Sequence, residues 1–306
     1  MAGWPWLQQS WVRLPPAVRA TCLMLFAMFF FTSMSIFIRL SAEELHAMVV
    51  VFWRNFLAVV LLVPWLVQRG RYAMRTRRLP LIAARSVVNV IGMAAGFTAI
   101  TLIPLAQATS LGFTAPLWTT LGAVLVLGEV IRFRRMAALL AGFAGVLIVL
   151  RPGFEELSTG AVLALANAFL LAITTLIVKR LTTTEHPEAI VAWMVILQSP
   201  LALVPALFVW DWPSVQAWIW LFALAGAGTI GHVCWTRAVH LGEVTQLQPL
   251  EFTKLPLIAL LAFVVFAEVP TVWTWLGGTL IFAATGYISL REAQLARERR
   301  HAGTSP

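Results

Sequence analysis

Ten apolar stretches, separated by short polar or proline-containing segments, fill most of the chain. About 20 apolar residues are enough for a helix to cross the hydrocarbon core of a bilayer. Residues 86–128 contain no charge and are too many for one crossing, so Pro104 marks a break between two helices. The pattern predicts an all-α integral membrane protein with ten transmembrane helices, at residues 20–38, 47–67, 80–101, 104–127, 135–151, 158–178, 188–209, 214–238, 244–267 and 271–290.

The composition agrees with this architecture and sets an orientation. Hydrophobic residues make up 60% of the chain and charged residues 11%, against about 25% charged in soluble domains. Sixteen of the 22 Lys and Arg residues fall in the two termini and in the loops after the second, fourth and sixth helices, as in cytoplasmic segments. We therefore expect a multi-pass protein of a bacterial-type cytoplasmic (inner) membrane, with the N-terminal segment 1–19 and the basic tail 291–306 both cytoplasmic.

The same bias explains the net charge of +9 without a nucleic-acid partner. Cys22 and Cys234 lie in apolar stretches and lack the spacing of a metal or redox site. We therefore expect neither a metal nor a cofactor.

The chain repeats itself once. Shifting the sequence by 139 or 140 residues superimposes residues of the same or similar type. The matched pairs include Arg39 and Lys179, Trp53 and Trp193, Pro116 and Pro256, and Glu129 and Glu268. Each repeat, 20–151 and 152–290, contains five predicted helices, and an odd number gives the two halves opposite orientations in the membrane. Inverted repeats of this kind, around a central cavity, are typical of transporters whose halves move about a fixed substrate site.

Three segments resemble a known family. They are FWRNFLAVVLLVPWL (52–66), FTAPLWTTLGAVLVLGEVIRFRRMAALLAGFAGVLIVLRPG (113–153) and KLPLIALLAFVVFAEVPTVWTWLGGTLIFAATGYI (254–288), and they resemble EamA-domain transporters of the drug/metabolite transporter superfamily. The resemblance covers about residues 20–290. It implies a ten-helix basket around a central cavity and secondary transport, often export, of amino acids, nucleotide-related metabolites, vitamins such as riboflavin, or S-adenosylmethionine.

A polar stripe interrupts the predicted ninth helix. Gln248, Glu251 and Lys254 follow one another at intervals of three residues, so they lie near one helix face. A charge at the middle of a membrane helix costs about 2.5–3.5 kcal/mol, and such residues usually mark a functional path. The first repeat has Leu111 and Thr114 at the positions of the two charges. The stripe is a candidate substrate or coupling site, which the family resemblance does not explain; a neutralised pair near a helix end is the structural alternative.

Further candidates for substrate binding or coupling are Arg54, Trp53, Asn89, Gln107 and His232. Arg54 stays charged and needs a carboxylate, backbone carbonyls, water or a substrate anion. Trp53 could stack on an aromatic or cationic substrate, although its repeat mate suggests a partly architectural role. Asn89 could instead bond a neighbouring helix, Gln107 lies near the position that mirrors the stripe, and His232, like the stripe glutamate, could carry a proton.

Three other charged residues lie near helix ends, where structural roles are expected. Arg85 is expected to extend its side chain to the membrane interface. Glu129 and Glu268, which match in the repeat, are expected to cap helices or orient loops.

Together these features predict a secondary transporter that moves a small organic metabolite by alternating access. An amino acid or its derivative is favoured, and a vitamin or nucleoside-like metabolite such as riboflavin or S-adenosylmethionine is the alternative. An intramembrane enzyme is a remote alternative, because the sequence contains no HExxH or GxSxG motif. A channel is also a remote alternative, because an inverted repeat with kinked central helices favours alternating access. The sequence contains no Walker motif, so we do not expect transport to be powered by ATP hydrolysis in this chain. The expected partners are the substrate, the lipid bilayer and, if transport is coupled, a proton. Uniport, the direction of transport and the oligomeric state stay open.

Overall fold

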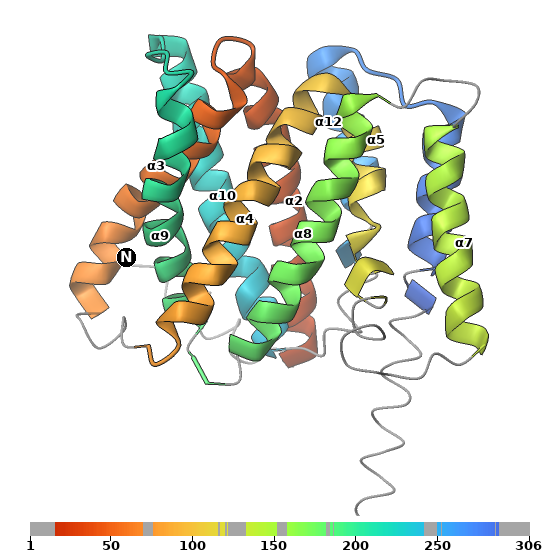
Figure 1. Cartoon of the computed structure of the whole chain (residues 1–306), viewed down its shortest axis with the longest axis horizontal. Coiled ribbons are helices and arrows are strands. Elements are labelled where there is room, and N and C mark those ends of the chain that lie inside the picture. The colour runs from red at the N-terminus through yellow and green to blue at the C-terminus, as the bar shows by residue number, and fades with distance from the viewer. Residues whose placement is uncertain are drawn as a thin grey trace, which may run out of the picture.

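The computed structural model describes residues 16–69, 76–115, 117–119, 121, 133–151, 158–181, 184–185, 187–241, 250–251, 253–284 and 286–287. These residues form helices that stand side by side as a bundle (Figure 1). The helices are α2 (Pro16–Ala42), α3 (Ala47–Arg69), α4 (Leu79–Leu102), α5 (Leu105–Gly112), α7 (Phe133–Leu150), α8 (Thr159–Leu181), α9 (Pro187–Leu207), α10 (Val215–Leu241), α12 (Lys254–Phe266) and the helix Val272–Ala284. Each predicted span overlaps one of them, which confirms the all-helical architecture.

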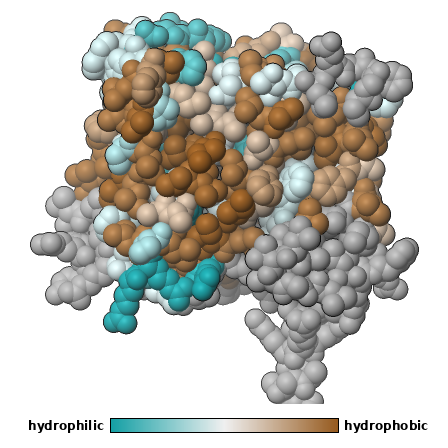
Figure 2. Space-filling view, viewed as in Figure 1, coloured by the Kyte–Doolittle hydropathy of each residue, from teal (hydrophilic) through white to brown (hydrophobic). Residues whose placement is uncertain are grey.

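The outer surface is apolar over the middle of the bundle. In the part of the chain that the structure describes, five helices, α2, α4, α8, α9 and α10, are long and apolar enough to cross a membrane. Large apolar side chains, among them Phe26, Leu140 and Val204, are exposed on these and neighbouring helices. Figure 2 shows a broad apolar band on one face, with polar residues gathered at its upper and lower edges. This surface is that of a multi-pass membrane protein.

The helices pack in pairs that correspond between the two halves of the chain. The helix α2 packs against α10, and α4 packs against α8. The first five spans correspond in order to the last five. If every helix is exchanged for its counterpart, the pair α2–α10 becomes α8–α4, and the pair α4–α8 becomes α10–α2. The same replacement converts the pair α2–α12 into α5–α8, and it leaves the pairs α3–α9 and α5–α12 unchanged. The core therefore lies where helices of the first half meet helices of the second half.

The fourth and ninth predicted spans are not continuous helices. The fourth span is interrupted after Gly112 by a turn that includes Thr114, and the ninth span is interrupted by a turn at Thr253. In both turns the threonine hydroxyl donates to the carbonyl oxygen three residues earlier, at 2.7 Å. A proline follows each turn in the sequence, Pro116 or Pro256, and proline cannot donate to the carbonyl four residues before it. The helix ladder is therefore interrupted at corresponding places in the two halves.

Candidate functional site

Arg54, in α3, is the most deeply buried of the predicted site residues that the structure describes, with 2% of its surface exposed. Its Nη1 donates a hydrogen bond to Asn55 Oδ1 at 3.0 Å, whereas its Nε has no partner among the described residues. The guanidinium lies against Gly228 of α10, where an added Cβ would be 3.2 Å from Nη2. The absence of a side chain at Gly228 allows α10 to approach this charge closely.

Arg85, in α4, is also buried, with 8% of its surface exposed. Its Nε and Nη1 have no hydrogen-bond partner in the part of the chain that the structure describes. The positive charge of Arg54 acts on Arg85, and both charges act on His232 of α10, which lies one turn after Gly228, the residue that the Arg54 guanidinium approaches. The ring of His232 meets the ring of Phe31 edge-on, with centroids 5.0 Å apart. We call Arg54, Arg85 and His232 the arginine–histidine cluster.

The expectation that Arg85 reaches the membrane interface is therefore wrong. The sequence places Arg85 near the start of α4, but the neighbouring helices enclose this end. Ile82, one turn earlier, is fully buried and packs in one cluster with Leu181 of α8 and Ile190 of α9. A side chain on this face of α4 points into protein and has no open path to the interface.

Glu251 and Lys254 are both half-buried, on either side of the turn at Thr253. Their charges attract each other, although the two side chains do not form a direct ion pair in the described structure. Glu251 Oε1 instead accepts a hydrogen bond from Trp235 Nε1 of α10, at 3.4 Å. The third member of the stripe, Gln248, lies outside the described residues.

Several of these residues are surrounded by protein yet keep accessible surface. His232, Glu251 and Lys254 lie deep within the bundle, and each is still half-buried rather than fully buried.

Trp53, by contrast, lies in an aromatic cluster with Phe52, Trp210 and Trp218. Its ring meets that of Trp218 edge-on at a centroid distance of 4.6 Å, and that of Trp210 at 5.8 Å. Only 8% of its surface is exposed. This geometry gives Trp53 a packing contact between α3 and α10, and its role in substrate stacking stays a prediction.

Asn89 and Gln107 are half-buried, on α4 and α5. Asn89 lies one turn after Arg85, so it occupies the same side of α4 as the arginine–histidine cluster. Gln107 lies on a helix that packs against both α8 and α12. Their part in substrate binding stays a prediction.

Two buried polar residues were not singled out by the sequence. Asn55 is fully buried; its Nδ2 donates to the Val51 carbonyl oxygen at 2.8 Å, and its Oδ1 accepts from the neighbouring arginine. Gln198 of α9 is also fully buried, and neither its Oε1 nor its Nε2 has a partner among the described residues. The available signal for Gln198 was a glutamine in the middle of an apolar span, but the sequence did not show which way it faces.

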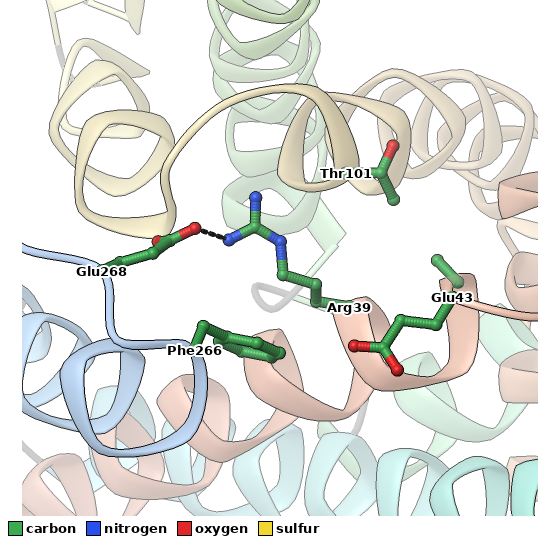
Figure 3. A pocket seen from close by; sticks show the side chains of 6 residues that line it. Arg39, Glu43, Thr101, Phe266 and Glu268 are labelled. Carbon is green, nitrogen blue, oxygen red and sulfur yellow. Dashed lines mark hydrogen bonds and ion pairs between the residues drawn. The ribbon is translucent and has the colours of Figure 1, made fainter.

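A separate cavity of about 320 Å³ lies where the C-terminal ends of α2 and α12 meet. It is lined by Arg39, Ala42, Glu43, Thr101, Phe266 and Glu268 (Figure 3). Arg39 forms an ion pair with Glu268 and donates to the Ile103 carbonyl oxygen at 2.9 Å. The other carboxylate oxygen of Glu268 accepts from the Leu105 N–H at 3.0 Å, so Glu268 caps α5. The predicted capping role is confirmed for Glu268, and Glu129 lies outside the described residues.

Comparison with known proteins identifies the family. A family model described as the EamA-like transporter family matches residues 18–151 and 158–290. The chain belongs to this family. Membership confirms the resemblance seen in three segments of the sequence. The family is one of membrane transporters.

Individual relatives extend over most of the chain. A riboflavin transporter of Rhizobium johnstonii is 34% identical over 252 residues, which cover 82% of this chain and 83% of that protein. An S-adenosylmethionine uptake transporter of Rickettsia prowazekii is 26% identical over 249 residues, covering 81% and 85%. A crystal structure that is 20% identical in sequence has a TM-score of 0.63 and covers 90% of this chain and 98% of its own, which is a similarity of fold.

Proposed function

We propose that this EamA-like transporter carries riboflavin or a closely related flavin across the cytoplasmic membrane. The observation that carries the proposal is the 34% identity to a riboflavin transporter over 82% of the chain. The amino-acid substrate that the sequence favoured has no comparable support, whereas its vitamin alternative does. The same relatives support transport as the activity, in preference to catalysis.

The buried donors suit such a molecule. One edge of a flavin ring carries two carbonyl oxygens and a ring nitrogen that accept hydrogen bonds. Arg54 and Arg85 offer guanidinium N–H groups without partners among the described residues, and they approach from α3 and α4. The proposed site is the space bordered by the arginine–histidine cluster, with Asn89 beside it.

We further propose that transport occurs by alternating access between two inverted five-helix repeats, 20–151 and 152–290. Three observations support this arrangement: the helix pairs exchange under a shift of five spans, the turns at Thr114 and Thr253 interrupt corresponding helices, and the family model matches the chain twice. Discontinuous helices next to a central site are a recurring feature of transporters built this way. Both termini on the cytoplasmic side remain our proposal from the arginine distribution.

S-adenosylmethionine is the second candidate substrate. A relative transports it, and its carboxylate and ammonium groups would find partners in the arginines and in Glu251. The arginines on α3 and α4 are positive, and Glu251, beside α12, is negative. Together they favour a molecule that carries both charges.

Uptake into proteoliposomes tests the choice. We expect saturable uptake of labelled riboflavin that excess unlabelled riboflavin abolishes and that S-adenosylmethionine or amino acids leave unchanged. The variant R54Q should lower the rate by about tenfold or more, because it removes a charge-assisted donor. R77Q is the matched control, since Arg77 is an exposed arginine outside the helices. Uptake of S-adenosylmethionine alone would support the second candidate, and uptake of neither would overturn the proposal.

A further inference from the structure

The arginine–histidine cluster carries more positive charge than the described structure balances. A guanidinium remains protonated in proteins, so Arg54 and Arg85 contribute two permanent charges. Neither forms an ion pair with a carboxylate among the described residues. Glu251 and Glu268 are engaged elsewhere, with Trp235 and with Arg39, and the Glu44 carboxylate accepts from Ser214.

This arrangement opposes stability. Two like charges that act on each other inside a membrane protein repel, and a buried N–H without an acceptor loses the hydrogen bonds that water would provide. Within the cluster, three such groups lack a partner among the described residues: Nε of Arg54, and Nε and Nη1 of Arg85. Buried charges retained at a cost usually serve binding or transport.

The geometry selects the kind of group that would restore the balance. The N–H groups of a guanidinium form a planar fork that matches the oxygens of a phosphate or carboxylate. Arg54 and Arg85 come from α3 and α4 of the first half, and His232 comes from α10 of the second half. An anionic group bound at this cluster would therefore lie between elements of the two halves of the bundle.

We infer that the arginine–histidine cluster is an anion site, and that it binds an anionic oxygen group, phosphate or carboxylate, of the transported molecule. The inference rests on the proposed function for the location of the substrate, and it refines the substrate class from a neutral flavin to an anionic one. Riboflavin 5′-phosphate and riboflavin differ only in this group, so they form a matched pair of probes.

Binding to the purified full-length protein in detergent, followed by flavin fluorescence, measures the preference. We expect riboflavin 5′-phosphate to bind about tenfold or more tightly than riboflavin. The variant R85Q should lower the affinity for riboflavin 5′-phosphate far more than that for riboflavin and so remove the preference, and R85K should keep part of it, because it retains the charge and loses the fork. Equal affinities in the unaltered protein, or an equal loss for both flavins in R85Q, would overturn the inference.

Thermal unfolding without flavin separates an anion site from a structural arginine. We expect R85M to raise the unfolding temperature, since an apolar side chain of similar length replaces an unpaired buried charge. A structural guanidinium would give the opposite shift and would overturn the inference. R77Q again removes one positive charge from an exposed position and should leave both binding and unfolding temperature unchanged.

Simple anions distinguish failure of this inference from failure of the proposed function. At constant ionic strength, inorganic phosphate should raise the unfolding temperature of the unaltered protein more than chloride does, and acetate reports on a carboxylate in the same way. R85M should lose this effect. Stabilisation by these anions without any flavin binding would keep the anion site and reject flavin transport. Flavin binding without any stabilisation by these anions would reject the anion site and keep flavin transport.

Discussion

Arg39 and Glu268 are 229 residues apart in the sequence and form an ion pair that joins the end of α2 to the end of α12. The ending of α12 positions the carboxylate: Ala267 adopts a left-handed conformation with φ 54°, and the Glu268 N–H donates to the Ala262 carbonyl oxygen at 3.2 Å. The carboxylate then reaches both Arg39 and the first N–H of α5. One side chain thus connects three helix ends on one side of the bundle.

We expect E268Q to destabilise the folded protein by about 1–3 kcal/mol, the usual cost of leaving a partly buried charged group without its partner. The glutamine can still accept from the Leu105 N–H, so the loss comes from the charge. Arg39 would keep the Ile103 carbonyl and the face of the Phe266 ring, 5.4 Å from the guanidinium carbon. Thermal unfolding of the purified protein measures the change.

A double-mutant cycle with R39Q isolates the pair. The two single variants and the double variant should show a coupling free energy of about 0.5–3 kcal/mol. The matched control is E43Q, because Glu43 lines the same cavity and is exposed. Additive effects of the two substitutions would contradict an ion pair that stabilises this end of the bundle.

The left-handed residue of α12 supplies a second prediction. Ala267 carries a Cβ in a conformation that glycine adopts without strain, and Gly128 occupies the matching position of the first repeat. We expect A267G to increase the free energy of unfolding by about 1 kcal/mol. The same substitution at Ala259, in the right-handed interior of α12, should lower it by about 1 kcal/mol. Equal effects at the two positions would argue against a conformational cause.

The architecture could be read from the sequence because each span had to be apolar along its whole length. The number of helices and their approximate ends followed from that requirement. The breaks at Thr114 and Thr253 did not follow, because the hydropathy of these residues is ordinary within a span. They depend on local bonds from a hydroxyl to a carbonyl three residues earlier, which compete with the helix ladder.

The site was only partly accessible to sequence reasoning. Arg54 could be singled out as a candidate because a permanent charge within a span is unusual. Arg85 was misjudged, because its distance from the helix end is visible in the sequence while the enclosing residues of α8 and α9 are not. Trp53 is predicted from the sequence to stack on a substrate, but Trp210 and Trp218, from a distant part of the chain, occupy its surroundings. Long-range packing decided all of these outcomes.

Glu44 provides a prediction on pH dependence outside the spans. Its carboxylate accepts from the Ser214 hydroxyl and from the Ser214 N–H, both at 2.7 Å. These bonds, the hydroxyl first, lower the pKa of Glu44 from its ordinary value of 4.5. A lowered pKa contributes stability above the unfolded-state pKa and loses it as the pH falls through the folded-state value.

We therefore expect E44Q to lower the unfolding temperature at neutral pH, with the difference from the unaltered protein vanishing as the pH falls below about 4. Unfolding curves collected between pH 3 and 7 measure the difference. E43Q, one residue away, serves as the control because Glu43 is also exposed and its sequence neighbourhood is the same. A difference that persists at the lowest pH would show that the glutamine acts through something other than charge.

The last prediction concerns Glu251 as the group that couples transport to protons. It is half-buried, accepts from Trp235 and lies within the field of Lys254, so a substrate or a proton arriving there would change an existing balance of charge. In proteoliposomes we expect riboflavin flux through the unaltered protein to respond to an imposed proton gradient. E251Q should give the same flux with and without the gradient, while E43Q keeps the full response. If E251Q also keeps the full response, coupling does not depend on Glu251. If flux through the unaltered protein does not respond to the gradient, transport is uniport. The buried charge of Glu251 beside Lys254 then serves substrate binding alone.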